Sequence, residues 1–318
     1  KMASGRNIAV YIAKETTFGT APASADSIIK VTGISADLKQ ETKKSNSRVG
    51  VRFSPGQYIV GQLGSITLDS EIYPDTVGYL FKGIANKETK TSSGSGYKHT
   101  FTPKDDGDPV TFTIQEDLAG LVRYNYLGCA FDELTIDAKV KDFATATITG
   151  SFQDKEEPDI YGYYTGSYST LSLFTPQMIS ISLGGSPTNY VKNMQIKISN
   201  GLYKEDFRLN KSNLVSSLPL GAGTITGNIE FTTDMLSEIS KYDSGTSTSM
   251  VITLESTELI AASEPYKIVI TIPYIFYSAA TINRDENFMT IKLDFEAFYN
   301  GTNDIYTIEL YDKKSTEY

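Results

Sequence analysis

Short segments in which apolar and polar residues alternate recur along most of the chain. In the clearest, 143–152 (FATATITGSF), the alanines, Ile148 and Phe152 fall on one face and the threonines fall on the other. A period of two is typical of a β-strand with one buried face. Comparable segments lie at 7–14, 28–41, 110–115, 122–127, 131–140, 178–183, 190–199, 249–255, 266–278, 288–298 and 305–311. The pattern predicts a mainly β, antiparallel fold.

One stretch of the chain occurs twice, at 64–82 (GSITLDSEIYPDTVGYLFK) and at 223–241 (GTITGNIEFTTDMLSEISK). The copies align without a gap, and average composition would give about one identity by chance. The identical pairs are Gly64/Gly223, Ile66/Ile225, Thr67/Thr226, Glu71/Glu230, Asp75/Asp234 and Lys82/Lys241. Strand-then-helix segments are common, so chance similarity is the alternative. Self-similarity at a fixed distance favours an internal duplication.

Each copy begins as a strand and ends as a short helix. In the first copy Pro74 precedes the helix, and in the second Thr233 can cap it while Asp234 suits its positive end. Helical spacing of apolar residues predicts the buried stripes. The stripe of the first helix contains Val77, Leu80, Phe81 and Ile84. The stripe of the second helix contains Met235, Ile239 and Tyr242.

The length of 318 residues exceeds the size at which one hydrophobic core usually stops growing. We therefore predict an N-terminal domain at 1–157, a linker at 158–175 that is rich in charge, Tyr, Gly and Ser, and a C-terminal domain at 176–318. Two long polar segments, 42–62 and 200–222, occupy the same place in the two halves. The first is expected to be a mobile loop or a long hairpin that needs a partner to order it, and the second is expected to be a polar loop.

The net charge of −9 argues against ordinary nucleic-acid binding, which needs a basic stripe. An acidic protein can still serve nucleic acid by repelling it, as the wall of a conduit does. The single cysteine, Cys129, excludes an internal disulfide framework. No apolar run approaches the roughly 20 residues of a membrane helix, and no signal peptide is visible, so we expect no membrane association.

The sequence offers no constellation for catalysis. His99 is the only histidine, and we expect it at the surface; Cys129 is expected to be a small buried hydrophobe. Asp105, Asp106 and Asp108 suggest a turn, with a cation site as the lesser alternative. No spacing selects a pair of glycosidase carboxylates. We therefore predict that the chain is not an enzyme and has no catalytic, cofactor-binding or metal-binding residues.

Five segments, in their order and spacing, resemble phage tail tube proteins, in particular the two-domain tube proteins of long non-contractile tails. They are ETTFGTAPA (15–23), GSITLDSEIYPDTVGYLFKGI (64–84), GYKHTFTP (96–103), LGCAFDELTIDA (127–138) and DFEAFYNG (294–301). The resemblance spans nearly the whole chain. It implies two tandem antiparallel β-sandwich tail-tube domains, each with one short helix, whose sheets join those of neighbours into a continuous β-barrel around a channel.

The resemblance also implies a function and partners. Rings would stack into the hollow tail tube of a siphovirus virion, assembled in the host cytoplasm, which conducts viral DNA during ejection without binding it specifically. A duplicated chain would give a ring of six tube domains from a homotrimer. The implied partners are other copies of the chain, the tape measure protein, the tail terminator and the tail tip proteins. Whether a contractile sheath surrounds the tube is left open.

Two sets of residues are candidates for these roles. Residues of the two polar segments are expected to act as inter-subunit arms: Lys43, Lys44, Arg48, Arg52, Phe53, Tyr58, Arg208 and Lys211. Polar residues of 143–152 and of its counterpart 288–298 are candidates to face the lumen: Thr145, Thr147, Thr149, Lys292, Asp294 and Glu296. The alternative function is a tandem β-sandwich adhesin or glycan-binding module, in which the Tyr-rich segment 161–168 could serve as a sugar platform.

Overall fold

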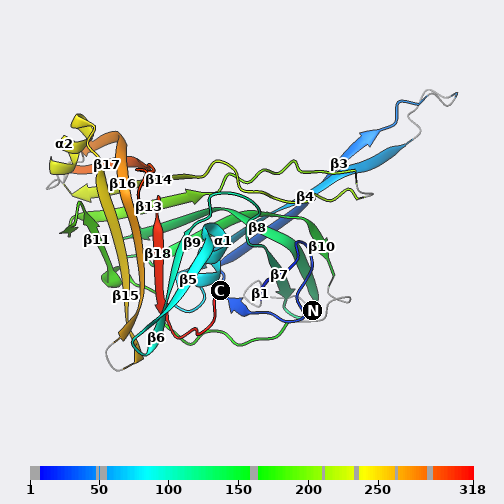
Figure 1. Cartoon of the computed structure of the whole chain (residues 1–318), viewed down its shortest axis with the longest axis horizontal. Helices are drawn as coiled ribbons and strands as arrows, with labels where there is room; N and C mark the ends of the chain where they lie inside the picture. The colour runs from blue at the N-terminus through cyan, green and yellow to red at the C-terminus, as the bar shows by residue number, and fades with distance from the viewer. Residues whose placement is uncertain are drawn as a thin grey trace.

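The computed structural model describes residues 8–47, 50, 56–157, 164–209, 212–232, 236–261, 264–284 and 289–318. The chain is mainly β, as predicted, with one large connected antiparallel sheet that does not close into a barrel within a single chain (Figure 1). The first half contains β1 (Ile8–Lys14), β2 (Ser27–Ile29), β3 (Gly33–Lys44), β4 (Gln57–Glu71), α1 (Gly78–Ala85), β5 (Asn86–Ser93), β6 (Gly96–Pro103), β7 (Phe112–Leu118), β8 (Val122–Lys139), β9 (Thr145–Phe152) and β10 (Asp154–Glu156). The second contains a 3-10 turn (Pro176–Met178), β11 (Ile179–Leu183), β12 (Ser186–Thr188), β13 (Val191–Ser199), β14 (Thr224–Thr232), α2 (Leu236–Ser244), β15 (Thr248–Ala261), β16 (Glu264–Arg284), β17 (Met289–Ala297) and β18 (Thr307–Asp312).

The long strand β8 organises the first half. Its N-terminal part pairs with β7 and β10, and its C-terminal part pairs with β9 and, across the middle of the chain, with β13. Strand β1 pairs with β2 and β7, and β3, β4 and β9 follow one another in the sheet. The sequence pattern predicted two strands, 122–127 and 131–140, where β8 is continuous. The strand passes through Gly128, whose φ of 65° is a conformation that glycine tolerates.

With β16 in the place of β8, the second half repeats these pairings except the one between β8 and β13. The N-terminal part of β16 lies between β15 and β18, and its C-terminal part pairs with β17. Strands β11, β12, β13 and β14 make the pairings that β1, β2, β3 and β4 make in the first half. Even the bulges coincide, since the ladder shifts between Phe131 and Glu133 in β8 and between Tyr277 and Ala279 in β16.

These ladders place equivalent residues slightly differently from the sequence alignment. In the first half, Ile66 of β4 pairs with Gly150 of β9, and in the second half Gly227 of β14 pairs with Phe295 of β17. The ladders therefore match Ile66 with Gly227, whereas the sequence alignment matches Ile66 with Ile225. Because side chains alternate with a period of two, both alignments put the same residues on the buried face. The ladders also make 190–199 the counterpart of 30–39, since Ala36 pairs with Ile66 and Ile196 pairs with Gly227.

The β5–β6 hairpin has no counterpart among the described residues of the second half. The hairpin extends the sheet of the second half, because β6 pairs with β18. The two halves are thus joined twice, by β8–β13 and by β6–β18, and one hydrophobic cluster contains residues of both. The division into domains at 1–157 and 176–318 stays a prediction.

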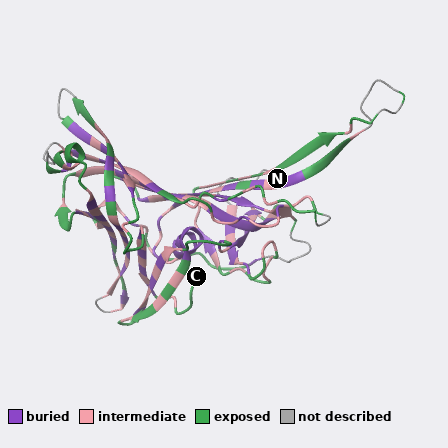
Figure 2. Ribbon diagram, turned by 45° about the horizontal axis from the view of Figure 1, so that its top comes forward, coloured by how far each residue is buried: buried purple, intermediate pink, exposed green. Residues whose placement is uncertain are grey.

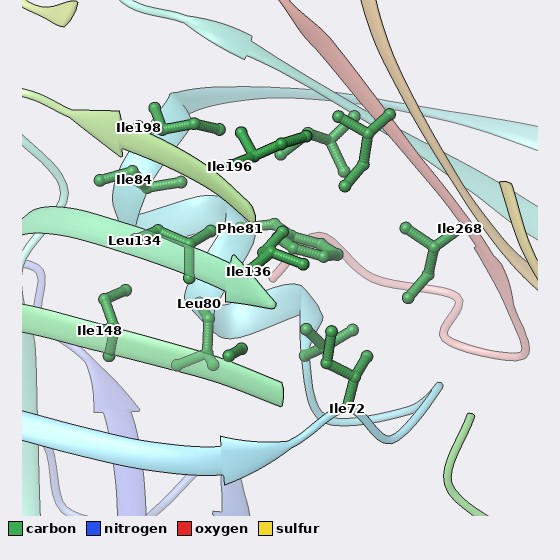
Figure 3. Packing of buried hydrophobic residues seen from close by; sticks show 14 of the residues in the cluster. Ile72, Leu80, Phe81, Ile84, Leu134, Ile136, Ile148, Ile196, Ile198 and Ile268 are labelled. Carbon is green, nitrogen blue, oxygen red and sulfur yellow. The ribbon is translucent and has the colours of Figure 1, made fainter. Parts of the chain in front are cut away.

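Helix α1 packs its predicted stripe into this cluster. Figure 3 shows Leu80, Phe81 and Ile84 directed at the buried faces of β8, β9 and β13. Gly83 allows the close approach, because a Cβ atom there would lie 2.1 Å from the ring of Phe131. Each large apolar side chain buried in this way contributes about 2–3 kcal/mol. Every residue of α1 is buried, so this helix is a core element.

Helix α2 is much less buried, and the stripe predicted for it is partly wrong. Tyr242 is exposed and Ile239 is only half-buried. Among residues 237–244 of this helix, the buried one is Glu238, which accepts a hydrogen bond from Tyr277 at 2.6 Å and pairs with Lys241 at 2.7 Å. The predicted cap residues and Met235 (233–235) lie outside the described residues. A half-exposed helix tolerates a buried carboxylate only when it is paired in this manner.

The β3–β4 hairpin extends away from the rest of the chain. Its outer part, coloured as exposed in Figure 2, continues to Lys44 and Gln57. For the described part of 42–62, the structure therefore shows a long hairpin and not a loop. The corresponding segment 200–222 has no strand among its described residues. It lies back against the first half, where Leu202, Val215 and Leu218 pack on Ala130.

Candidate functional site

One face of the large sheet packs on the core, and the opposite face is polar. Along β9, Ala146 and Ile148 are buried while Thr145, Thr147 and Thr149 are half-exposed. Along β17, Leu293 and Phe295 are buried while Lys292, Asp294 and Glu296 are half-exposed. All six residues predicted to face a lumen therefore lie on this one polar face. Whether that face lines a channel stays a prediction.

The polar face carries more acidic than basic residues. Its described acidic residues are Asp37, Glu41, Asp69, Glu71, Glu133, Asp137, Glu230, Asp294 and Glu296. Its described basic residues are Lys39, Lys43, Lys139, Lys197 and Lys292. An excess of acidic groups on one surface repels phosphate chains and keeps them from binding. The alternation in the sequence predicts which side chains share one face of a strand. Only the strand pairings of the fold show that the faces of both halves form one surface.

Local contacts hold several of these groups in place. Thr147 donates a hydrogen bond to Asp69 at 2.7 Å, and Gln195 donates one to Asp137 at 2.9 Å. Lys197 pairs with Glu133 at 2.9 Å across the joint between β8 and β13. Lys292 and Asp294, both about two-fifths exposed, pair at 3.5 Å. Such exposed pairs contribute little stability, so the charges are free to serve an external function.

The predicted arm residues are only partly described. Lys43, Lys44 and Tyr58 lie on the exposed part of the β3–β4 hairpin, and 63% of Tyr58 is exposed. Arg208 lies in the other segment and forms an ion pair with Asp206 at 2.6 Å. Arg48, Arg52, Phe53 and Lys211 lie outside the described residues. An inter-subunit role for these residues stays a prediction.

Two strands of the repeated part of the sheet, one in each half, have a partner strand on one side only. Within the described residues, β3 pairs only with β4, and the C-terminal part of β16 pairs only with β17. In Figure 1 these edges belong to opposite sides of the molecule, β3 on the right and β16 on the left. The equivalent edges inside the chain, β13 and the C-terminal part of β8, pair with each other. Unpaired edges are templates for association with another chain.

An exposed aromatic patch next to the β16 edge was missed by sequence reasoning. The rings of Phe276 and Phe298 make an edge-to-face contact at 5.5 Å, and both are more than one-third exposed. Tyr274 and Tyr299 are exposed beside them. The available signal was the run of apolar residues after Pro273, which breaks the alternation of β16. We call Tyr274, Phe276, Phe298 and Tyr299 the aromatic patch.

His99 is fully buried, so the prediction that it lies at the surface is wrong. It lies on β6 between Glu88 and the C-terminal segment, with Nδ1 at 2.7 Å from Glu88 and Nε2 at 3.2 Å from Asp312. Tyr318 closes the cluster, since its hydroxyl donates to Asp312 and its backbone N–H donates to Glu88 at 3.1 Å. No local pattern could find this cluster, because Glu88 and Tyr318 are 230 residues apart in the sequence.

The surroundings of His99 favour its charged form. Burial acts to lower the pKa of His99, but hydrogen bonds with Asp312 and Glu88 outweigh burial and raise the pKa to about 9. Glu88 also pairs with Lys82 at 3.3 Å. The charged groups therefore satisfy one another, and both ring nitrogens of His99 have acceptors. The cluster fastens the C-terminal segment to the first half.

Cys129 and the three aspartates of 105–108 are the other residues that the sequence singled out. Cys129 is buried, as predicted, and burial raises the pKa of its thiol well above the ordinary value. Asp105, Asp106 and Asp108 lie in the connection between β6 and β7. In the described part of the chain, no three histidine, cysteine or acidic residues gather as metal ligands. No helix of the described residues is long and apolar enough to cross a membrane.

The repeated pairings, the polar face and the open edges are features of a structural protein that assembles through its sheets. A family model described as phage tail tube protein matches residues 5–297. The chain therefore belongs to the phage tail tube protein family, whose members are structural components of the virion tail. No curated protein was found to match the sequence.

Proposed function

We propose that this chain is the major tail tube subunit of a siphovirus and that three copies form a ring of six repeated units. Rings stack into a hollow tube that conducts viral DNA during ejection. The observation that carries this proposal is the β8–β13 joint, which shows how one repeat adds its sheet to the next within a chain. The same kind of joint between chains uses both unpaired edges and closes the ring.

The polar face becomes the wall of the channel in this proposal. Its excess of carboxylates repels the phosphates of DNA in transit, so that DNA slides without specific binding. The tube needs no catalysis and no cofactor. Its tail partners are the tape measure protein, the tail terminator and the tail tip proteins, and assembly takes place in the host cytoplasm. The β3–β4 hairpin and the 200–222 segment serve as arms between subunits or rings.

Negative-stain electron microscopy of the purified chain over a concentration series tests the assembly. We expect rings or hollow tubes, with three chains in each ring in top views. If tubes need an initiator, addition of tail tip complexes supplies it. A chain that stays monomeric at every concentration, with and without the initiator, and that binds glycans would overturn the proposal.

The role of the polar face has its own test. Thr145→Lys, Thr147→Lys and Thr149→Lys each add a positive charge on the proposed wall. We expect phages with these variants to form normal tails and to eject DNA more slowly, and the delay to shrink at high salt because salt screens the attraction. Tyr242→Lys, on the exposed part of α2, is the matched control. Unchanged ejection in all three variants would refute the electrostatic role.

A further inference from the structure

A cavity of about 240 Å³ lies where segments from both halves of the chain meet. Its walls come from 103–105 after β6, 198–200 at the end of β13, 220–225 at the start of β14, and 299 and 304–306 between β17 and β18. Ile198 and Ile225 of this lining belong to the buried face of the sheet, whereas the adjacent Lys197 and Thr226 do not. The cavity therefore lies on the side of the sheet opposite the polar face.

Backbone hydrogen bonds hold the walls of this cavity in place. The N–H of Lys104 donates to the carbonyl of Ala85 at 3.0 Å. The N–H of Leu220 donates to the carbonyl of Gly107, also at 3.0 Å, and fastens the 200–222 segment to the connection after β6. The turn between β17 and β18 is fixed by Asn300, whose side-chain oxygen accepts two backbone N–H groups at 3.0 and 2.9 Å. The cavity is thus formed before a ligand arrives, and binding needs little ordering of the chain.

The lining contains a buried hydroxyl group that the described chain does not use. Tyr306 is 2% exposed, and its hydroxyl has no hydrogen-bond partner among the described residues. A buried polar group in this condition is rare, because leaving it unpaired costs free energy. Burial, together with the negative charge of Asp304, raises the pKa of this hydroxyl, so it keeps its proton. Tyr306 therefore offers a hydrogen-bond donor to a molecule in the cavity.

The exposed part of the lining is acidic and aromatic. Asp105 and Asp304 are exposed, and so is Tyr299 of the aromatic patch, at 67%. Lys104 is the only cation of the described lining, and its ammonium group already donates to the carbonyl of Asp108 at 2.8 Å. The two carboxylates are hydrogen-bond acceptors, and the ring of Tyr299 is a flat apolar surface with a polar tip.

This lining selects among chemical classes of ligand. The two carboxylates repel an anion. A metal ion needs several oxygen ligands close together, and no three acidic, histidine or cysteine residues gather in that way in the described part of the chain. An apolar molecule would leave the hydroxyl of Tyr306 without a partner. A ring that carries several hydroxyl groups on an apolar carbon frame matches the donor, the acceptors and the aromatic surface together.

We propose that the cavity binds one pyranose ring of a glycan, whose hydroxyl groups donate to Asp105 and Asp304 and accept from Tyr306, while a C–H face of the ring lies on Tyr299. The volume is below the about 300–1,000 Å³ of pockets for drug-sized ligands, which suits a single ring. This binding activity is additional to the proposed tube. Because the cavity lies opposite the polar face, it is outside the proposed channel.

Saturation-transfer NMR of the purified full chain tests the binding. The probes are methyl glucoside, methyl galactoside, methyl mannoside and N-acetylglucosamine, each titrated separately. We expect saturation transfer to at least one of these sugars, with a dissociation constant of about 1–10 mM, because one ring makes few contacts. Absence of transfer to all four sugars at about 50 mM would overturn the proposal.

Variants of the lining locate the sugar. Tyr306→Phe removes one hydroxyl and should weaken binding about three- to tenfold, the usual value of one hydrogen bond. Tyr299→Ala and Asp304→Asn should weaken binding by similar factors. Tyr58→Ala, on the β3–β4 hairpin, removes a comparably exposed tyrosine, and Asp294→Asn removes a carboxylate from the polar face. Both controls should bind as the wild type does. Equal binding by all five variants would place the sugar elsewhere and refute the site.

A stability measurement tests the unused hydroxyl separately. Tyr306→Phe should unfold at a denaturant concentration no lower than that of the wild type, because the hydroxyl that it removes has no partner in the described chain. Tyr277→Phe is the matched control, since the hydroxyl of this buried tyrosine donates to Glu238 at 2.6 Å. It should unfold at a lower concentration and bind sugar normally. Equal destabilisation by the two variants would show that Tyr306 already has a partner in the protein, which overturns its role as a donor.

The outcomes separate this site from the tube. Sugar binding is measured on the single chain, so its absence leaves the tube function standing. A chain that binds sugar through Tyr306 and Tyr299 but forms no rings keeps the site and loses the proposed function. Isothermal titration with calcium chloride examines the competing ligand class. Calcium binding that Asp304→Asn abolishes, without sugar binding, would assign the cavity to a cation and refute the glycan proposal.

Discussion

The C-terminal parts of β8 and β16 occupy equivalent places in the two halves but differ in what lies beside them. Strand β8 is flanked by β9 and β13, whereas β16 has β17 on one side only. Helix α1 is completely buried over the first of these strands, and α2 leaves several residues exposed over the second. The difference teaches that the second half completes the strand pairing of the first, whereas the equivalent edge of the second half has no partner strand among the described residues.

The helices give the largest expected difference between the halves. Phe81→Ala removes a fully buried ring from α1 and should lower the free energy of unfolding by about 3–5 kcal/mol. Tyr242→Ala, on α2, should change it by less than about 0.5 kcal/mol, because the side chain is exposed. Denaturant unfolding of both purified chains measures the difference. Similar losses in the two variants would show that α2 packs as tightly as α1.

The paired and unpaired strand edges give the next comparison. Ile136→Ala should cost the single chain about 2–5 kcal/mol, because it opens a cavity in the joint between the halves. Ile282→Ala, at the equivalent position, should cost less than about 0.5 kcal/mol in the monomer. Both are measured by denaturant unfolding below the concentration of assembly. A large loss from Ile282→Ala in the monomer would mean that this edge is already covered.

His99 allows the joint between β6 and β18 to be tested by pH. Its folded pKa of about 9 exceeds the ordinary value of 6.5, so its protonation stabilises the fold. This stability is fully present below pH 6.5 and is lost as pH rises through about 9. The difference corresponds to about 3 kcal/mol. Unfolding free energies measured from pH 6 to 10 should show this decline in the wild type.

His99→Gln is the control for that pH dependence. Glutamine keeps a polar side chain but cannot be charged, so the decline above pH 6.5 should disappear in the variant. The variant should also be less stable than the wild type at pH 6, since Glu88 and Asp312 lose a cationic partner. An undiminished decline in His99→Gln would assign the pH dependence to other groups.

The smallest expected effects are on the polar face. Thr147→Val removes the hydrogen bond to Asp69 and should cost about 1 kcal/mol. Lys292→Met removes the exposed pair with Asp294, at the equivalent place in the second half, and should cost less than about 0.5 kcal/mol. Thermal unfolding at low salt measures both. A larger loss from Lys292→Met would indicate that its charge is held more firmly than the geometry shows.

Local pattern predicted the mainly β class, most strands and the stripe of α1, because each depends on residues that are neighbours in the sequence. It missed β10 and β12, which are three residues long and too short for alternation to be visible. It also missed β5, in which every residue after Asn86 is polar and exposed or half-exposed. It placed Tyr242 in a buried stripe because spacing shows which residues share a helix face but not how deeply that face is buried.

The features that matter most for function depend on distant parts of the chain. His99 is buried because Glu88, Asp312 and Tyr318 surround it, and no spacing rule brings these residues together. The exposure of Ile282 is informative only when it is compared with the burial of Ile136 at the equivalent position. Sequence placed the threonines of β9 and the charged residues of β17 on one face each, but only the strand pairings show that these faces are continuous.

The β8–β13 joint also sets how assembly depends on concentration. Since it lies within one chain, it forms as the chain folds and does not depend on how many other chains are present. In the proposed ring of three chains, half of the six joints are of this permanent kind. The other half form only when chains meet, and their formation costs free energy because the associating chains lose translational freedom. Within the proposed ring, the repeat thus leaves a single kind of reversible contact, through which an initiator or a change in subunit supply can decide when a ring closes.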